Sequence, residues 1–561
     1  MSNYDVAIVG GGPAGSTVGS LLKKYAPDLS VLVLERENFP RDHVGESQLP
    51  LISTILDEMG AWDAVEVAGF PIKVGATYRW GVSPDLWHFN FLPHGELSPK
   101  PRPARYRGQR KATAFQVDRA VYDTILLDHA ANLGCEVRQN TKVAAVDVEG
   151  DRVTGLTLEG GERIEATYYV DASGGGGTIR RAIGVEVESP TSLRNIAIWD
   201  YWRNASWAEE IGVGGTRVQV LSLGYGWIWF IPLGPDRTSV GLIVPAAYYK
   251  ETGKRPAQLY AEALAEEPRV RELMQGATSE GKLATTNDWS FVADRLAGEN
   301  WFLAGDACGF ADPILAAGMT LAHAGGRDVA YTILELARGA EDGEWLRSSY
   351  DEVGRRRIRQ HIRFADYWYS TNAQFTDLKS FTREIAKDAG LDLDPDAAFQ
   401  WLGTGGFVND HFQGASIGTF SVAAVKQLSR ILSDAETTWE IAKVNELRLD
   451  LAGAVQRPFA VMENGRVSRE RSYERDGKRL PVIGAFRAAI AALQQERELP
   501  KIVSALRARA GSDAELLEAL QALEAMLAEG WVRGKRNPNK PLGLNLVVEP
   551  ESPMMEFAHT P

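Results

Sequence analysis

Residues 6–15 of the chain read VAIVGGGPAG, and this stretch decides the fold. The apolar run at residues 6–9 predicts a central parallel strand that is buried on both faces. The turn GGGPAG follows at residues 10–15, and a helix is predicted for residues 16–24. A second strand is predicted at residues 31–34, directly before Glu35, which lies 20 residues beyond Gly15. This spacing is typical of a βαβ dinucleotide-binding unit.

Each residue type in this unit has a physical role. Gly10 permits the tight turn, Gly12 lets the backbone approach a pyrophosphate, and Gly15 lets helix and strand pack closely. The helix N-terminus then faces the phosphates. Glu35 can accept hydrogen bonds from ribose hydroxyls, which suits FAD and NAD equally. The predicted cofactor contacts of this unit are Gly10, Gly12, Pro13, Ala14, Gly15, Glu35 and Arg36.

Composition narrows the class of protein. The 561 residues are 44% hydrophobic and 24% charged, which is ordinary for globular chains and excludes disorder and rods. The net charge of −13 argues against nucleic acid and anionic membranes as partners. No apolar stretch approaches a membrane span, and the first residues resemble no signal peptide. Two distant cysteines and eight histidines without HxxH spacing predict neither a disulfide nor a metal site. We therefore expect a cytoplasmic enzyme.

Three later segments resemble flavoprotein motifs. Residues 116–119 (QVDR) open a predicted helix that runs to about residue 133, residues 171–174 read DASG, and residues 305–307 read GDA. Together with the glycine turn, their order is similar to that of the group-A flavin monooxygenases, and the resemblance implies FAD. It also implies further FAD contacts at Arg119, Asp171, Gly174 and Asp306. Because no second GxGxxG follows a strand, reduced FAD is expected from a separate flavin reductase.

The most specific segment is GWIWFIP at residues 226–232. It resembles the WxWxIP signature of the flavin-dependent halogenases, and it implies catalytic roles for Trp227, Trp229 and Pro232. Tryptophans at i and i+2 lie on one face of a strand, where they can wall off the flavin from the substrate. Halide then remains the only nucleophile close enough to be oxidised. The alternative is a pair of core tryptophans in a tryptophan-rich chain.

Two segments near the N-terminus carry the same resemblance. Residues 39–50 (FPRDHVGESQLP) are similar to the family's FPRxxVGES stretch, which implies that Arg41 and Ser47 line the FAD site. Glu46 either belongs to that site or forms an ion pair with Arg41. Residues 70–81 (FPIKVGATYRWG) align Lys73 with the essential lysine of the family. Its ammonium can polarise hypohalous acid, or its free amine can hold the halogen, and burial would favour the amine. The alternative is a solvated surface lysine.

Residues 308–320 (CGFADPILAAGMT) resemble the family's FxxPxxSxG stretch. The implied halide donors are the backbone N–H groups of Ala317 and Gly318, where a helix is predicted to begin. Ala316 replaces the usual serine, which puts the halide affinity in question. Leu315 stands where tryptophan halogenases keep a glutamate, which argues against free tryptophan as the substrate. The implied FAD contacts here are Pro313, Gly318 and Met319.

The fold class that follows is α/β. A Rossmann-type, group-A monooxygenase-like FAD-binding domain is expected from residues 1–60, 105–190 and 283–355. An inserted antiparallel substrate sheet is expected from residues 60–105 and 190–283. Residues 356–561 are expected to be mainly helical, with Ser512 and Asp513 capping a helix at residues 514–529. The basic residues 533–540 suit either binding of an acidic partner or a solvent-exposed segment that follows the helix.

The expected function is FAD-dependent halogenation in natural-product (antibiotic) biosynthesis. Reduced FAD, oxygen and chloride or bromide would give hypohalous acid, which would halogenate a phenol, a pyrrole or a carrier-tethered acyl group. Two alternatives remain open: a flavin monooxygenase or reductase of the same fold, which Ala316 favours, and a non-catalytic flavin-binding accessory protein. The sequence does not define the substrate, the halide, the regiochemistry, the oligomeric state or whether FAD is covalently attached.

Overall fold

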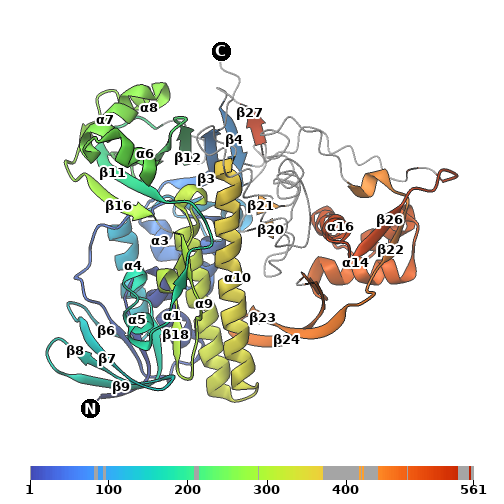
Figure 1. Cartoon of the computed structure of the whole chain (residues 1–561), viewed down its shortest axis with the longest axis horizontal. Helices are drawn as coiled ribbons and strands as arrows, with labels where there is room; N and C mark the ends of the chain where they lie inside the picture. Colours follow the sequence, from blue (N-terminus) through green and yellow to red (C-terminus); the bar gives the residue numbers. More distant parts are fainter. Residues whose placement is uncertain are drawn as a thin grey trace.

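The computed structural model describes residues 2–80, 86–91, 97–207, 214–288, 290–370, 416–417, 420–421, 440–476, 478–540, 542 and 555–557. These residues form two large sheets, a pair of long helices and a C-terminal unit (Figure 1). The prediction for residues 356–561 therefore lies partly outside the described residues. None of the described helices has both the length and the apolar character needed to cross a membrane.

The first sheet contains the predicted strands. Its parallel strands follow the order β6 (Glu136–Arg138), β2 (Val31–Leu34), β1 (Ser2–Val9), β9 (Arg163–Asp171), and β18 (Trp301–Leu303) pairs with β9. The antiparallel strands β7 (Val143–Glu149) and β8 (Arg152–Leu158) extend it beyond β9. Val6, Ala7 and Ile8 are fully buried, as the apolar run predicts. The parallel pairing of β1 and β2 is confirmed.

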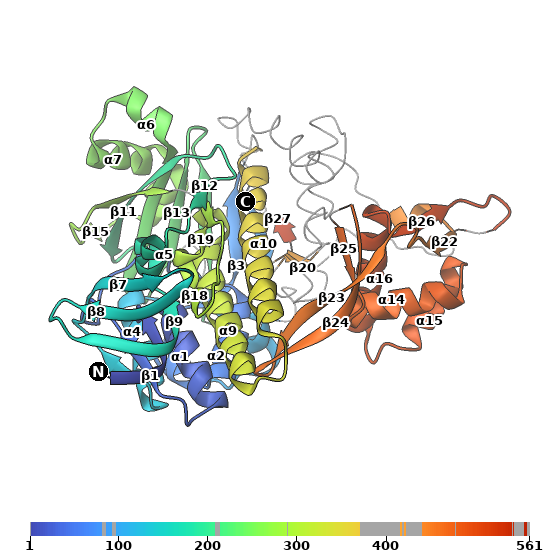
Figure 2. The ribbon, with the colours of Figure 1, turned by 60° about the horizontal axis from the view of Figure 1, so that its bottom comes forward.

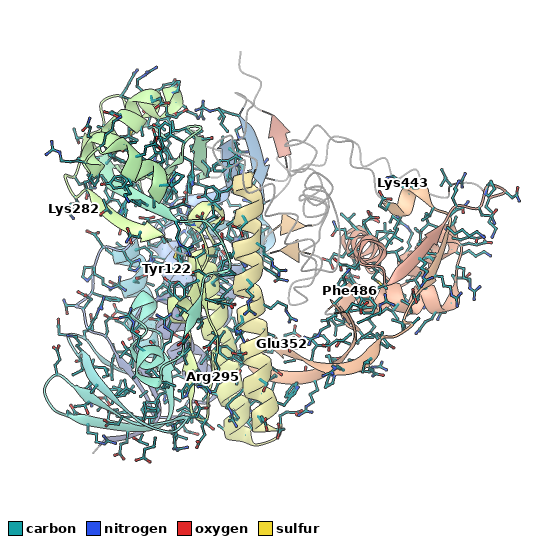
Figure 3. All side chains as sticks on the ribbon, viewed as in Figure 1. Tyr122, Lys282, Arg295, Glu352, Lys443 and Phe486 are labelled. Carbon is teal, nitrogen blue, oxygen red and sulfur yellow. The ribbon has the colours of Figure 1, made fainter. Side chains whose placement is uncertain are left out.

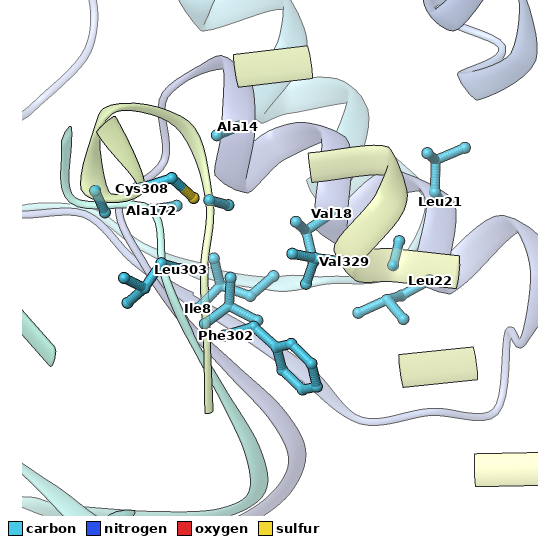
Figure 4. Close-up of a cluster of buried hydrophobic side chains, with 14 of the residues drawn as sticks. Ile8, Ala14, Val18, Leu21, Leu22, Ala172, Phe302, Leu303, Cys308 and Val329 are labelled. Atoms are coloured by element: carbon cyan, nitrogen blue, oxygen red, sulfur yellow. The ribbon is translucent and has the colours of Figure 1, made fainter. Parts of the chain in front are cut away.

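Three helices cover this sheet and build its core. They are α1 (Pro13–Tyr25), α4 (Arg119–Asn132) and α9 (Ala317–Arg338). Helix α1 begins three residues earlier than predicted, because a proline lacks the N–H that the first helical turn leaves unused. A Cβ on Gly15 would lie 1.9 Å from the carbonyl oxygen of Gly10, so only glycine fits there. Val18, Leu21 and Leu22 of α1 pack near Ile8 and Val329 (Figure 4).

The second sheet has ten strands. Its order is β15 (Thr278–Ser279), β11 (Asn195–Arg203), β14 (Arg237–Pro245), β13 (Trp227–Pro232), β12 (Gly215–Ser222), β3 (Ile72–Arg79), β4 (Trp87–Asn90) and β27 (Met555–Phe557), with β16 (Ala284–Asp288) beside β11 and β5 (Ala114–Phe115) beside β3. All pairs are antiparallel except β12 with β3. The expected antiparallel insertion thus contains one parallel junction, and β5, β16 and β27 come from outside the predicted segments.

One face of the second sheet packs on short helices. They are α6 (Ala246–Thr252), α7 (Pro256–Glu266) and α8 (Pro268–Leu273). Ile198, Ile228, Phe230 and Leu242 point to this side and form a separate core with Leu259 of α7. The opposite face carries Trp199, Trp227 and Trp229 and is called the tryptophan face below. The remaining short elements are α2 (Pro50–Met59), α3 (Trp62–Val67), α5 (Thr178–Ile183), β10 (Val187–Glu188), β17 (Phe291–Ala293) and β19 (Gly309–Phe310), and the three helices among them pack in the core of the first sheet.

The long helix α10 (Gly343–Ser370) lies beside α9, with the C-terminal unit on its far side (Figures 1 and 2). Glu352 of α10 forms an ion pair of 2.7 Å with Arg479 of that unit (Figure 3). The unit contains α14 (Gly484–Gln495), α15 (Leu499–Arg507), α16 (Asp513–Ala528), β22 (Glu446–Leu449), β23 (Val455–Glu463), β24 (Arg466–Arg475), β25 (Lys478–Pro481) and β26 (Val532–Lys535).

In addition to the expected helices, the C-terminal region contains a three-stranded antiparallel sheet, which the charged segments of residues 455–481 form. The predicted cap at Ser512 is confirmed, since its hydroxyl accepts from the Glu515 N–H at 3.2 Å. The predicted glycine after this helix is also confirmed, because Gly530 adopts φ +79°.

The close approach of Gly241 to Trp229 gives a stability prediction. Gly241 pairs with Trp229 across β13 and β14, and an added Cβ would lie 2.1 Å from its indole. Gly241→Ala should therefore lower the free energy of unfolding by about 1–3 kcal/mol, the usual cost of overpacking. Urea unfolding followed by tryptophan fluorescence measures the change. Gly234→Ala is the control, since its methyl group meets no described atom within 4 Å. Equal stability of the two variants would contradict the packing.

Candidate active site

The glycine turn and Glu35 lie together at the end of the first two parallel strands. Glu35 Oε2 accepts from the Gly11 N–H at 2.7 Å, and its Oε1 accepts from the Glu37 N–H at 2.9 Å. No described side chain caps α1 at Gly12, so the first N–H groups of the helix remain available for phosphate oxygens. Arg36 is exposed and pairs with Glu37. The turn fits a pyrophosphate through its backbone.

Buried polar atoms without partners mark a second part of this site. The Ser47 hydroxyl, both polar atoms of the Gln116 side chain and the Thr320 hydroxyl are buried and have no hydrogen-bond partner among the described residues. The backbones of Ser47 and Gln116 form an isolated antiparallel β-bridge. Because buried polar groups are nearly always paired, these atoms fit a polar ligand such as the flavin part of FAD.

Charged residues hold residues 41–46 in place, the segment between the glycine turn and the unpaired polar atoms. Arg119 forms a bidentate pair with Asp123 at 2.7 and 2.8 Å, and it donates to the carbonyl oxygens of Val44 and Gly45. Arg41 lies 3.7 Å from Asp123, whereas Glu46 accepts from the Tyr201 hydroxyl at 3.0 Å. Burial raises the pKa of Glu46. The suggested Arg41–Glu46 ion pair is therefore replaced by separate partners for each residue.

Two predicted acidic contacts differ in their surroundings. Asp171 accepts hydrogen bonds from Ser173, Ile179 and Arg180 of its own chain, so its carboxylate already holds the loop around Gly174. Asp306 has its pKa raised to about 6 by burial, an effect that the charge of Arg119 partly opposes. The Asp306 carboxylate has no hydrogen-bond partner among the described residues, so it is freer than that of Asp171 to accept from a ligand hydroxyl.

The signature tryptophans gather on the tryptophan face. The ring centroids of Trp227 and Trp229 lie 6.1 Å apart, and those of Trp199 and Trp229 lie 6.5 Å apart. Trp229 donates to the Ser239 hydroxyl at 3.1 Å. Strand alternation turns Pro232 to the opposite face, so the structure does not bring it together with the tryptophans. Tyr201, also on the tryptophan face, bonds to Glu46, and this face is therefore turned toward the Ser47 segment.

A register shift in β3 decides where Lys73 points. Lys73 pairs with Thr216, but Gly75 pairs with the next residue, Arg217, so Val74 is an extra residue in β3. Thr216 shares a face with Val220, which is paired with Trp229. The bulge therefore places Lys73 on the tryptophan face, whereas unbroken alternation from Gly75 would place it on the opposite one.

The surroundings of Lys73 favour a neutral amine. Its side chain is 2% exposed, and Nζ lies 5.5 Å from the centroid of the Phe91 ring. Burial lowers the pKa of Lys73 to about 7. A large fraction of Lys73 is then unprotonated near neutral pH, in contrast to a solvated lysine. The alternative of a surface lysine is excluded by this burial.

The predicted halide turn lies at the start of α9, as expected for Ala317 and Gly318. Ala316 precedes them with φ +54°, a conformation that is strained for alanine. Pro313 begins a short 3₁₀ turn, and Met319 is buried in the first turn of α9. The first N–H groups of α9 are not capped by any described side chain, so the helix can bind an anion there.

The sequence alone missed four buried residues next to this turn. Tyr369 accepts from Trp227 Nε1 at 2.7 Å and donates to Asp312 at 3.1 Å. Asn195 donates to the other oxygen of Asp312 at 3.0 Å, and Asp366 lies three residues before Tyr369 on α10. Asp312 belongs to a recognised motif segment, but no motif marks the other three. Only their spatial arrangement identifies them.

Comparison with known proteins agrees with this geometry. Residues 3–365 match the family model described as FAD binding domain, and the chain belongs to that family. The fold and the phosphate-binding turn thus define an FAD-binding flavoprotein.

The similar proteins specify the class further. The chain is 33% identical over 352 residues to the tryptophan 2-halogenase of Chondromyces crocatus, covering 61% of this chain and 63% of that protein. It is 29% identical over 385 residues to the 1H-pyrrole-2-carbonyl peptidyl-carrier-protein chlorinase of Pseudomonas fluorescens, covering 67% and 85%. The crystal structure of CmlS, a flavin-dependent halogenase, matches with a TM-score of 0.72 and 26% identity over 96% of both chains. The chain is a member of the flavin-dependent halogenase family.

Proposed function

We propose that this protein halogenates an electron-rich substrate with Lys73 as the residue that transfers the halogen. The observation that carries the proposal is the burial of Lys73 on the tryptophan face, where its pKa is lowered to about 7. A buried amine without a described acidic partner is costly to maintain and is typical of functional sites. The aligned region covers less than two thirds of the tryptophan 2-halogenase, so the activity rests on the site itself.

The cofactor and the chain have separate tasks. When bound, reduced FAD supplies, with dioxygen, the oxidising equivalents that convert chloride or bromide to hypohalous acid. The N–H groups of Ala317 and Gly318 hold the halide, and the indoles of Trp227 and Trp229 keep the substrate away from the flavin. The Lys73 amine takes up the halogen of hypohalous acid and water leaves. The halogen then passes to the substrate carbon, and the proton from that carbon goes to the Lys73 nitrogen, which restores the free amine.

The proposed substrate class rests on the residues of the tryptophan face and on the relatives. Tryptophan rings gather on this face, and a planar aromatic or acyl-aromatic group packs well against indole rings. One relative acts on a pyrrole attached to a carrier protein. We infer a phenol, a pyrrole or a carrier-tethered acyl group as the substrate, with a separate flavin reductase as the electron donor. A cytoplasmic location fits this chemistry.

Substitution of Lys73 tests the transfer step. Lys73→Met keeps the length of the side chain but cannot hold halogen, so brominated product should fall by about a thousandfold or more, the effect of roughly 4 kcal/mol in the barrier. FAD affinity and oxygen consumption should stay near wild type. Product mass spectrometry with reduced FAD, oxygen and bromide measures the loss. Lys282→Met, an exposed lysine, is the control. Near-normal bromination by the Lys73 variant would refute the assignment.

The pH profile provides an independent check. Because the free amine takes up halogen, the halogenation rate should rise through a midpoint of about pH 7, the pKa of Lys73. Oxygen consumption in the same reactions should not follow this midpoint, since it does not need the amine. A ratio of product to oxygen consumed that stays constant across this range would contradict the haloamine route.

The supply of electrons can be tested without any substitution. No second GxGxxG follows a strand in the sequence, so NADPH alone should reduce the bound FAD very slowly. Adding an unrelated flavin reductase should start turnover. Stopped-flow absorbance of the flavin measures the reduction. Rapid direct reduction by NADPH would instead support the monooxygenase alternative.

A further inference from the structure

Buried side chains from four segments form one hydrogen-bonded chain beside the halide turn. Trp227 Nε1 donates to the Tyr369 hydroxyl at 2.7 Å, and that hydroxyl donates to Asp312 Oδ1 at 3.1 Å. The Ile314 N–H donates to the same oxygen at 2.9 Å, and Asn195 donates to Asp312 Oδ2 at 3.0 Å. The chain thus connects the tryptophan face directly to the turn before α9.

Tyr369 occupies the middle of this chain. It is fully buried near the end of α10, and its ring packs 5.8 Å from that of Trp80, which in turn lies 6.3 Å from Trp227. Removing its hydroxyl would leave the Trp227 indole N–H buried without this acceptor. Because an unpaired buried donor is costly, the indole would move to find another partner.

Asp312 transmits the position of Tyr369 to the halide donors. Its carboxylate caps the 3₁₀ turn η5 (Pro313–Leu315) through Ile314, and Ala316 at φ +54° directly follows this turn. A strained residue keeps its conformation only when its surroundings enforce it. The N–H groups of Ala317 and Gly318 are therefore held in place by the hydrogen bonds of Asp312.

We propose that Tyr369 is a positioning residue for halogenation, which holds the indole of Trp227 and the Asp312 turn in a fixed mutual arrangement. This inference rests on the proposed function and adds a role for α10, which carries none of the recognised motifs. Its consequence is specific: loss of the hydroxyl loosens the halide donors and the tryptophan wall together. Halide affinity and the yield of product per oxygen consumed should therefore fall in the same variant.

Asp366 extends the same cluster. It lies three residues before Tyr369 on α10, its Oδ1 accepts from the Thr191 hydroxyl, and its Oδ2 has no hydrogen-bond partner among the described residues. Burial and the charge of Asp312 raise the pKa of Asp366 to about 8, against the opposing effects of Thr191 and Arg363. The carboxyl is therefore neutral at pH 7. Above about pH 8 its ionisation adds a negative charge beside Asp312, which should repel a halide at the turn.

The decisive variant is Tyr369→Phe, which removes one oxygen and keeps the ring. We expect a rise of about tenfold in the bromide KM, in proportion to the loss of one hydrogen bond to a charged group. The share of oxygen released as hydrogen peroxide should rise as well. The FAD dissociation constant should remain within about twofold of wild type, because the phosphate turn is not touched.

Tyr260→Phe is a matched control. The Tyr260 hydroxyl also accepts from an indole, that of Trp202, at 3.0 Å and donates to the Val240 carbonyl at 2.9 Å. Tyr260 belongs to α7, which packs on the face of the second sheet opposite to the tryptophan face. Tyr260→Phe should lower thermal stability as Tyr369→Phe does, but it should leave the bromide KM unchanged. An equal change of bromide KM in both variants, or no change in Tyr369→Phe, would overturn the positioning role.

Two further measurements complete the test. Bromide titration of oxidised, FAD-loaded protein, followed by flavin absorbance, should show weaker binding in Tyr369→Phe without any turnover. If wild type binds bromide but makes no brominated product, the proposed function fails, and this titration still decides the role of Tyr369. In wild type the bromide KM should rise above about pH 8, and Asp366→Asn should abolish that rise. If the bromide KM still rises above about pH 8 in Asp366→Asn, ionisation of Asp366 is not the cause of the weaker halide binding.

Discussion

The register shift between β3 and β12 is the constraint on which the candidate active site depends. One extra residue, Val74, reverses the alternation of the strand and places Lys73 on the same face of the sheet as Trp229. The same parallel pairing of β3 with β12 also joins the two inserted segments, residues 60–105 and 190–283, into one sheet. Without this junction, the buried amine and the buried tryptophans would not lie on one face of one sheet.

Burial of that amine has an energetic cost that the fold must offset. A pKa lowered from 10.5 to about 7 corresponds to a penalty on the order of 5 kcal/mol for the charged form. The apolar contacts of the two sheets supply stability well beyond this amount, since Val74 and most neighbouring side chains are fully buried. The consequence is an amine of which a large fraction is unprotonated near neutral pH, and this is the form that the proposed halogen transfer requires.

The helices divide the work between cofactor and halide. Helix α1 directs its N-terminus to the expected pyrophosphate, and α9 directs its N-terminus to the expected halide. His323 of α9 connects them: the Thr17 hydroxyl of α1 lies 2.8 Å from its Nδ1, and the Tyr122 hydroxyl lies 2.9 Å from its Nε2. Burial lowers the pKa of His323 to about 3, so this link stays neutral and does not respond to pH in the working range. The N-termini of α1 and α9, the proposed binding sites for pyrophosphate and halide, are thus connected through buried side chains.

The sequence by itself determined the features that rest on short-range physics. The apolar run at residues 6–9, the steric need for Gly15 and the cap at Ser512 each depend on neighbours within a few residues, and each appears in the structure as predicted. The halogenase signature likewise placed Trp227 and Trp229 on one face, because strand alternation is local. Only the tertiary structure decided the facing of Lys73 and the contact of Tyr369 with Asp312. Those features depend on which strands and helices pair across more than fifty residues, and pairing register is set by the whole core and not by any local pattern.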